Sequence, residues 1–290
     1  MIDHLCVFIP VKEVFALLNN TDYDKFRDFL RKACGIVLGD NKQYLVQSRL
    51  RRIMADESIA TVGELVDKMN RSIRNPLREA VVDAMTTNET LWFRDVHPFR
   101  ILEEKILPEL LSNKGMSQIR LWSAACSTGQ EPYSISMVYD EFKRRNLGAA
   151  RVPLSIVATD ISASVLATAR KAEYEMLAIG RGLSKERMNT YFTKTPDGSW
   201  KVKPEICRGV EFRSLNLMDS YSLLGKFDII FCRNVLIYFS AESKLDILKR
   251  MHAALKPGGY LVLGASESLS GLPDKYEMVH CNPGIIYRAK

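Results

Sequence analysis

Short apolar segments alternate with helical patterns from Ile119 to the end of the chain, and this alternation constrains the fold more than any other feature. It is typical of a parallel sheet whose strands are connected by crossover helices. We predict strands at 119–123, 154–159, 210–214, 227–232, 260–264, 277–281 and 285–288. The last two are separated by Asn282-Pro283-Gly284, a turn so short that it joins antiparallel neighbours. The sequence therefore predicts an α/β fold with a doubly wound, mostly parallel sheet and a C-terminal antiparallel hairpin.

The hairpin favours the class I methyltransferase type of this fold, because a plain dinucleotide-binding domain does not need one. Ahead of the sheet, apolar residues at three- and four-residue spacing predict helices at 23–34, 42–54, 62–71, 77–85 and 97–111. We therefore expect an all-helical N-terminal domain at 1–95, a linking helix at 96–118 and the sheet domain at 119–290.

An insertion lies between the second and third predicted strands, at about 171–209. It contains a helical pattern at 185–192 and a hairpin signal around Pro196-Asp197-Gly198. Because it is too long for a simple crossover, we expect a small inserted β-subdomain.

Bulk composition excludes several classes of protein. No apolar run approaches the roughly 18–20 residues of a membrane span, and the first 18 residues lack the layout of a signal peptide, so we expect a cytoplasmic protein. The six cysteines are scattered, which argues against a zinc site or a disulfide scaffold, and we expect no metal. The net charge of +7 suits an acidic partner, but it does not distinguish nucleic acid, an anionic membrane and an acidic protein surface.

A loop of small residues follows the first predicted strand, from Ser123 to Gly129. Such a loop lets the backbone approach a ligand, although it can also be purely structural. The G-x-G-x-x-G pattern is absent, which counts against a dinucleotide. Asp160 ends the second strand, where a carboxylate accepts the ribose hydroxyls of a nucleoside; the alternative is a helix N-cap, which Ser162 could supply instead.

Polar residues also follow the strand at 227–232. Arg233, Asn234 and Tyr238 are therefore expected near the reacting centre, because ligands bind at the carboxyl ends of such strands. Cys232 lies there too, but no activating histidine is near it in sequence, so packing is the favoured role.

Four motifs together resemble the CheR-type chemoreceptor glutamate methyltransferases: NETLWFR at 88–94, STGQEPYS at 127–134, ATDIS at 158–162 and CRNVLIYF at 232–239. The resemblance covers nearly the whole chain. It implies S-adenosylmethionine as cofactor, S-adenosylhomocysteine as product, and a cofactor pocket lined by Asn88, Thr90, Arg94, Glu131, Asp160, Asn216, Leu217, Arg233 and Asn234. Trp92 stands where the family has phenylalanine and Gln130 where glutamate is usual, two departures that concern the fine shape of the pocket.

The reaction implied is in-line attack of a glutamate carboxylate on the methyl group of a sulfonium. Because glutamate is ionised at neutral pH, no general base is required. We expect Arg94 to bind the methionine carboxylate of the cofactor, or the substrate oxygen that does not attack, and Tyr238 to orient the acceptor or contact the sulfonium methyl group.

The predicted helix at 42–54 carries Arg49, Arg51 and Arg52 and no acidic residue. A solvated face is the ordinary explanation, but the resemblance favours docking to the glutamate-rich methylation region of chemoreceptors. The hairpin loop of the insertion is short, so we expect no dependence on a C-terminal peptide tether of the receptor. We expect neither nucleic-acid binding nor membrane insertion; a methyltransferase acting on RNA and a non-enzymatic module that senses the cofactor are the competing interpretations.

Overall fold

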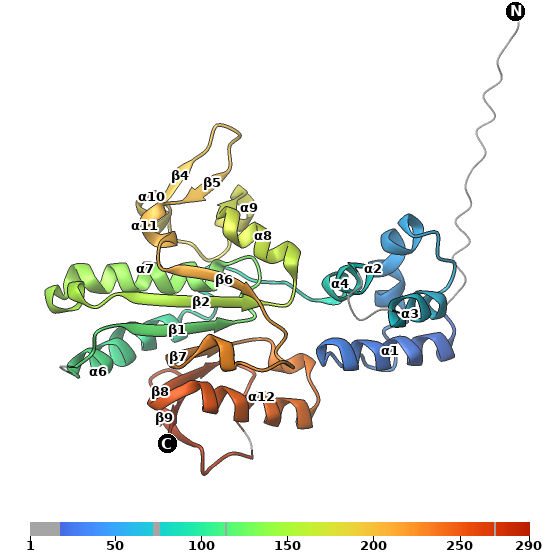
Figure 1. Cartoon of the computed structure of the whole chain (residues 1–290). Helices are drawn as coiled ribbons and strands as arrows, with labels where there is room; N and C mark the ends of the chain where they lie inside the picture. The colour runs from blue at the N-terminus through green and yellow to red at the C-terminus, as the bar shows by residue number, and fades with distance from the viewer. Residues whose placement is uncertain (1–17, 72–75, 114, 270) are drawn as a thin grey trace, which may run out of the picture. The chain divides into compact units, whose positions relative to one another are not determined.

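The computed structural model describes residues 18–71, 76–113, 115–269 and 271–290 (Figure 1). The described residues divide into two compact units, one within Met1–Lys32 and Leu38–Met85 and the other within Ala33–Val37 and Thr86–Lys290. The first 17 residues of the predicted helical domain, including Cys6, lie outside the described residues. None of the helices in the described part of the chain has the length and apolarity needed to cross a lipid bilayer.

The first unit is helical, as predicted. Its helices are α1 (Asn20–Cys34), α2 (Gln43–Asp56), α3 (Val62–Asn70) and α4 (Pro76–Met85), close to the expected positions. The apolar residues that share the helical period are buried, for example Phe26 and Leu30 on α1 and Val46 and Leu50 on α2. The side chain of Thr61 accepts a hydrogen bond from the Glu64 amide and so caps the start of α3.

A seven-stranded sheet forms the centre of the second unit, in the order β6-β2-β1-β7-β8-β10-β9. Its strands are β1 (Ile119–Ala124), β2 (Leu154–Asp160), β6 (Val210–Ser214), β7 (Phe227–Cys232), β8 (Leu255–Leu263), β9 (Tyr276–His280) and β10 (Ile285–Ala289). The pairs from β6 to β8 are parallel, whereas β10 is antiparallel to both β8 and β9. This confirms the predicted fold class and its C-terminal hairpin. β8 begins earlier than predicted, because Leu255 already pairs with Phe227 before a shift in register.

The two faces of the sheet are covered by different helices. These are α7 (Gln130–Arg145), α8 (Ala163–Lys171) and α12 (Ala241–Ala254), with shorter turns at Leu147–Arg151, Ser222–Leu224 and Leu236–Tyr238. Along β7, Ile229 and Phe231 belong to the apolar cluster that includes α7, whereas Ile230 and Cys232 belong to the cluster that includes α12. Alternate residues of a strand point to opposite faces, so β7 is buried on both sides, as its continuous apolar run predicts.

The predicted linking helix is interrupted. It consists of α5 (His97–Ile101), a π-helical turn (Leu102–Ile106) and α6 (Leu107–Ser112). Pro108 has no amide hydrogen to donate to the carbonyl four residues before it, which accounts for a local departure from α-helical hydrogen bonding. Periodicity alone did not predict this, because the π-turn keeps Leu102 and Ile106 buried.

The inserted segment forms a separate three-stranded antiparallel sheet in the order β3-β5-β4. Figure 1 shows its β4–β5 hairpin. Its elements are β3 (Glu173–Tyr174), α9 (Met176–Ile179), α10 (Lys185–Tyr191), β4 (Phe192–Lys194), β5 (Trp200–Val202) and α11 (Pro204–Cys207). The hairpin expected around Pro196-Asp197-Gly198 connects β4 and β5.

Trp92 anchors this small sheet to the segment that precedes α5. Its indole is fully buried and makes edge-on contacts with the rings of Tyr174 and Phe192, with centroids 5.0 and 5.2 Å away. Its amide donates a hydrogen bond to the carbonyl of Arg181 at 3.1 Å. Trp92 therefore packs against the insertion. A tryptophan in place of phenylalanine at this position thus changes the packing of the insertion.

We expect Gly182→Ala to destabilise the protein more than Gly198→Ala. Both glycines have a left-handed backbone, with φ of +93° and +90°, so alanine is strained at both. A Cβ at Gly182 would lie 2.1 Å from the carbonyl oxygen of Trp92, whereas one at Gly198 would meet nothing within 4 Å. Urea unfolding should show an additional loss of about 1–3 kcal/mol for Gly182→Ala. Equal losses would show that the close approach to Trp92 is unimportant.

Candidate functional site

The polar residues expected near the site lie at the carboxyl ends of the parallel strands. The loop 125–129 follows β1, Asp160 ends β2, and Arg233 and Asn234 follow β7. Because β1 lies between β2 and β7 in the sheet, these three segments are neighbours. The structure thus brings together the polar residues that follow the carboxyl ends of the predicted strands.

The loop after β1 has an unusual backbone. Ala125, Ser127 and Gly129 all have a left-handed conformation, with φ of 57°, 51° and 94°. Such conformations typically cost about 1–3 kcal/mol for a non-glycine residue and persist only where the surroundings enforce them. Tyr174 contributes to this, because its hydroxyl donates a hydrogen bond to the Thr128 carbonyl at 2.7 Å.

Asp160 holds this loop through its carboxylate. One oxygen accepts the Ser127 amide at 2.8 Å and the other accepts the Ser162 amide at 3.0 Å. The alternative role as an N-cap of α8 is excluded, because the hydroxyl of Ser162 accepts the Val165 amide at 3.2 Å and caps the helix. Asp160 therefore shapes the strand-end loop, with its side chain fixed at the edge where ligands bind in such sheets.

Arg233 forms the most buried ion pairs among the described residues at this edge. Its side chain is only 2% exposed and contacts Glu131 at 3.0 Å and Asp95 at 2.8 Å. It also donates to the carbonyl of Arg94 at 2.7 Å. The second oxygen of Glu131 accepts the hydroxyl of Ser123 at 2.8 Å. Within the described residues, the buried Nε–H of Arg233 has no hydrogen-bond partner.

The segment from Asn88 to Val96 contributes a further strained backbone. Phe93, Asp95 and Val96 have positive φ values of 48°, 67° and 53°, although none is glycine. Val96 is β-branched and 67% exposed, so packing of its own side chain does not explain the conformation. Strain of this kind concentrates at functional sites, which supports a role for this polar-aromatic segment.

Hydrogen bonds tie the same segment to the loop after β1. The carbonyl of Asn88 accepts the hydroxyl of Ser127 at 2.8 Å, and the Phe93 amide donates to the hydroxyl of Ser134 at 3.2 Å. The guanidinium of Arg94 is half-buried and donates to the carbonyl of Glu89 at 3.0 Å. Asn88 therefore lies beside the loop of small residues, and the guanidinium of Arg94 binds the backbone of its own segment, on which Thr90 also lies.

Asn216 and Leu217 follow β6, and a distant segment of chain reaches them. The amide of Asn216 donates to the carbonyl of Ala33 at 2.8 Å, and its oxygen accepts the Met218 amide at 3.0 Å. Leu217 is buried. We call residues 33–37, which belong to the second unit, the strap.

The strap also contacts the turn that follows β7. The amide of Val37 donates to the carbonyl of Tyr238 at 2.9 Å. A Cβ on Gly35 would lie 2.6 Å from the ring of Phe239 and 2.7 Å from the sulfur of Met218. The sequence analysis does not predict this role, because the helical pattern at 23–34 ends before Gly35.

Glu267 was also missed. It follows β8, and its carboxylate accepts backbone amides from Asn234, Leu236 and Gly264 at 2.7–2.8 Å. An acidic residue in the loop that follows a buried strand is a related signal to Asp160 at the end of β2, and it could have pointed to Glu267.

The cysteines at this edge are not activated. Cys126 and Cys232 are buried, and desolvation raises the pKa of both thiols well above the usual range. A raised pKa disfavours the reactive thiolate, which supports packing as the role of Cys232. In the part of the chain that the structure describes, no cluster of three or more potential metal ligands occurs.

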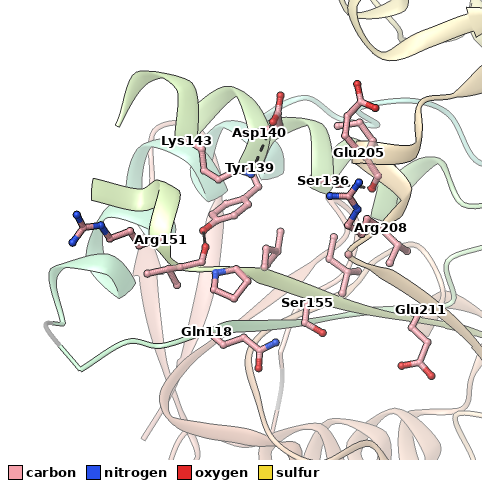
Figure 2. A pocket seen from close by; sticks show the side chains of 17 residues that line it. Gln118, Ser136, Tyr139, Asp140, Lys143, Arg151, Ser155, Glu205, Arg208 and Glu211 are labelled. Atoms are coloured by element: carbon pink, nitrogen blue, oxygen red, sulfur yellow. Dashed lines mark hydrogen bonds and ion pairs between the residues drawn. The ribbon is translucent and has the colours of Figure 1, made fainter. Parts of the chain in front are cut away.

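A large open cavity lies elsewhere, at the amino ends of β2 and β6 (Figure 2). It encloses about 690 Å³ and is bordered by charges of both signs, which are Asp140, Lys143, Arg151, Glu205, Arg208 and Glu211. Ligands of doubly wound sheets bind at the opposite ends of the strands, so the cluster at the carboxyl edge is the better candidate.

The basic residues expected on α2 differ in their surroundings. Arg49 is half-buried and donates to the carbonyl of Met85 at 2.7 Å, at the end of α4. Arg51 is exposed, and Arg52 is 93% exposed with a loose contact of 3.7 Å to Asp56. Arg49 thus has a structural role within the helical unit, whereas Arg51 and Arg52 lie on its surface.

Comparison with known proteins agrees with this geometry. Residues 88–285 match the family model described as "CheR methyltransferase, SAM binding domain", and residues 21–86 match "CheR methyltransferase, all-alpha domain". The chain belongs to the CheR methyltransferase family.

Relatives match over almost their full length. The chain is 61% identical to "Chemotaxis protein methyltransferase 1" of Pseudomonas aeruginosa and 60% identical to "Chemotaxis protein methyltransferase Cher2" of Pseudomonas putida, each alignment covering 93% of this chain and 98% of the relative. It is 34% identical to the "Chemotaxis protein methyltransferase" of Salmonella typhimurium over 90% of this chain and 88% of that one.

We expect Glu131→Gln to lower the free energy of unfolding by about 1–3 kcal/mol. The substitution removes one of the two charged partners of the buried Arg233 and leaves Asp95 as the other. Glu211→Gln is the matched control, since the pair of Glu211 with Arg213 is exposed and such pairs contribute little. Urea titration measures both. A loss from Glu131→Gln no larger than that from the control would contradict a structural role for the buried pairs.

Proposed function

We propose that this protein transfers the methyl group of S-adenosylmethionine to glutamate side chains of bacterial chemoreceptors, giving methyl esters that set adaptation in chemotaxis. The match of both family domains, in a chain aligned nearly end to end with chemotaxis protein methyltransferases, carries the proposal. The enzyme is an S-adenosylmethionine-dependent methyltransferase, and the bound cofactor supplies an electrophilic methyl group on a sulfonium.

The donor set at the carboxyl edge fits this cofactor. The fixed carboxylate of Asp160 suits ribose hydroxyls, and the unpartnered Nε–H of the buried Arg233 suits a carboxylate such as that of the methionine part. The left-handed backbone of loop 125–129 permits close approach of a ligand. The proposed lining residues are Asn88, Thr90, Arg94, Glu131, Asp160, Asn216, Leu217, Arg233 and Asn234.

The protein's own contribution to the reaction is orientation and exclusion of water. An acceptor glutamate is already anionic at neutral pH, so no side chain has to remove a proton. Anion and cation combine into neutral products, and water stabilises the separated ions more than the transition state. Holding the acceptor in line in a site from which water is excluded therefore accelerates transfer, and orientation alone can contribute about 7–11 kcal/mol.

Two residues are proposed to contact the reacting groups. Arg94 binds the methionine carboxylate or the substrate oxygen that does not attack, since a guanidinium on the attacking oxygen would weaken the nucleophile. Tyr238, in the turn after β7, orients the acceptor or contacts the methyl group. Their positions on segments fixed by hydrogen bonds support these roles.

Receptor recognition is assigned to other parts of the chain. We assign docking to the helical domain at 1–95, where Arg51 and Arg52 would contact the receptor and Arg49 supports the fold.

The linking helix at 96–118 connects this domain to the methyltransferase domain at 119–290, which includes the insertion at about 171–209. The β4–β5 loop is short, with the Thr195 amide donating to the Ser199 carbonyl at 2.9 Å, and this supports independence from a receptor peptide tether. The protein acts in the cytoplasm at receptor arrays and binds no nucleic acid.

The proposal is tested by following radiolabelled methyl transfer to receptor-containing membranes and to RNA. Labelled receptors that release methanol in base identify carboxyl esters. Labelled RNA, or cofactor binding without any transfer, would replace the proposal with one of the two competing functions.

Arg94→Ala should reduce turnover or cofactor affinity at least about tenfold, because a charged contact to a carboxylate is lost. Arg151→Ala is the control, since Arg151 is exposed and borders the cavity at the other ends of the strands. Methyl-transfer kinetics and calorimetry with S-adenosylhomocysteine provide the measurements. Unchanged values in both would remove Arg94 from the site.

A double charge reversal, Arg51→Glu with Arg52→Glu, should raise the KM for receptor about tenfold at low salt, and the effect should shrink as salt is added. Arg49 is left intact, because its bond to Met85 stabilises α4. Reversal of the exposed Arg31 and Lys32 on α1 is the control and should change the KM little. Intact receptor methylation by the Arg51/Arg52 variant at low salt would refute docking through this face.

A further inference from the structure

The turn between β7 and α12 carries two residues proposed for the site, Asn234 and Tyr238. Its backbone is irregular: Asn234 has φ of 58°, and residues Leu236–Tyr238 form a single 3-10 turn. The amides of Asn234 and Leu236 donate to a side chain outside the turn. The shape of the turn therefore depends on the acceptor that binds these amides.

That acceptor is the carboxylate of Glu267. One oxygen accepts the Leu236 amide at 2.7 Å. The other accepts the Asn234 amide at 2.7 Å and the Gly264 amide at 2.8 Å. Hydrogen bonds to an ionised acceptor are short and strong, so one carboxylate fixes three amides from two separate segments.

The contact also joins the ends of two neighbouring strands. Gly264 directly follows β8, and Asn234 comes two residues after the end of β7, which pairs with β8. The fit is tight, because a Cβ on Gly264 would lie 2.6 Å from the carboxylate of Glu267 and 2.8 Å from the Asn234 amide. The absence of a side chain at Gly264 thus lets the carboxylate reach both strand ends.

We infer that Glu267 is a positioning residue for methyl transfer, whose carboxylate sets the turn that presents Asn234 and Tyr238 to the cofactor and the acceptor. The inference rests on the proposed function. Both oxygens of Glu267 accept backbone amides, so it acts through the turn and not on the reacting atoms. Small displacements of groups that orient reactants can reduce rates about a hundredfold.

The first test is Glu267→Gln, which keeps the side-chain volume but leaves one acceptor oxygen for three amides. Turnover per S-adenosylhomocysteine-binding site should fall about 10–100-fold, whereas the KM for receptor should stay within about twofold, because docking uses a different surface. Glu277→Gln, at an exposed position of β9, removes the same charge and should leave turnover unchanged. Dividing turnover by the number of S-adenosylhomocysteine-binding sites distinguishes a misplaced turn from a smaller fraction of folded protein.

The second test keeps the carboxylate of Glu267 but displaces it. Gly264→Ala should displace the carboxylate of Glu267 and reduce turnover in the same way, whereas Gly148→Ala, whose Cβ would meet nothing within 4 Å, should not. If Glu267→Gln does not fold, Gly264→Ala decides the matter. If the wild-type enzyme methylates receptors and both variants stay within threefold of its turnover, the role of Glu267 is wrong and the proposed function still holds. A wild-type protein inactive on receptors would overturn the proposed function, and this inference with it.

Discussion

The buried guanidinium of Arg233 is the interaction on which the candidate site depends. It directly follows β7 and binds Glu131 in the first turn of α7 and Asp95 in the strained segment before α5. A desolvated cation is tolerated only with such partners, and removing one of them is costly. Three segments far apart in the sequence are therefore held at one edge of the sheet by a single side chain.

Carboxylates that accept backbone amides shape the remaining loops. Asp160 fixes the loop after β1, and Glu267 fixes the turn after β7, each by binding amides that no strand or helix satisfies. The two acids enclose the region where β1 and β7 end side by side. An edge built in this way keeps irregular backbone in place while these loop amides stay hydrogen-bonded.

The sequence predicted the sheet, because apolar runs, turn residues and the short connection at Asn282-Pro283-Gly284 are local signals. It also predicted that the polar residues at the strand ends would gather at one edge, since parallel strands place their carboxyl ends together. Contacts between distant segments were not predictable in this way. The bond of Arg49 to Met85, the reach of Glu267 to Asn234 and the contact of Ala33 with Asn216 depend on tertiary packing, for which a single sequence carries no periodic signal. The identities of the cofactor-lining residues came from family resemblance and stay predictions.

The strap makes the catalytic unit discontinuous in sequence. Residues 33–37 comprise the last two residues of α1 and the three that follow it, yet they form hydrogen bonds with Asn216 and Tyr238. A fragment cut at the boundary near Thr86 would lack them, and the Asn216 amide and the Tyr238 carbonyl would lose partners. The helical portion is consequently not a detachable module. Exchanging the helical portion between homologues would also replace the strap, which belongs to the second unit. Chimaeras should therefore keep residues 33–37 from the same parent as the methyltransferase domain.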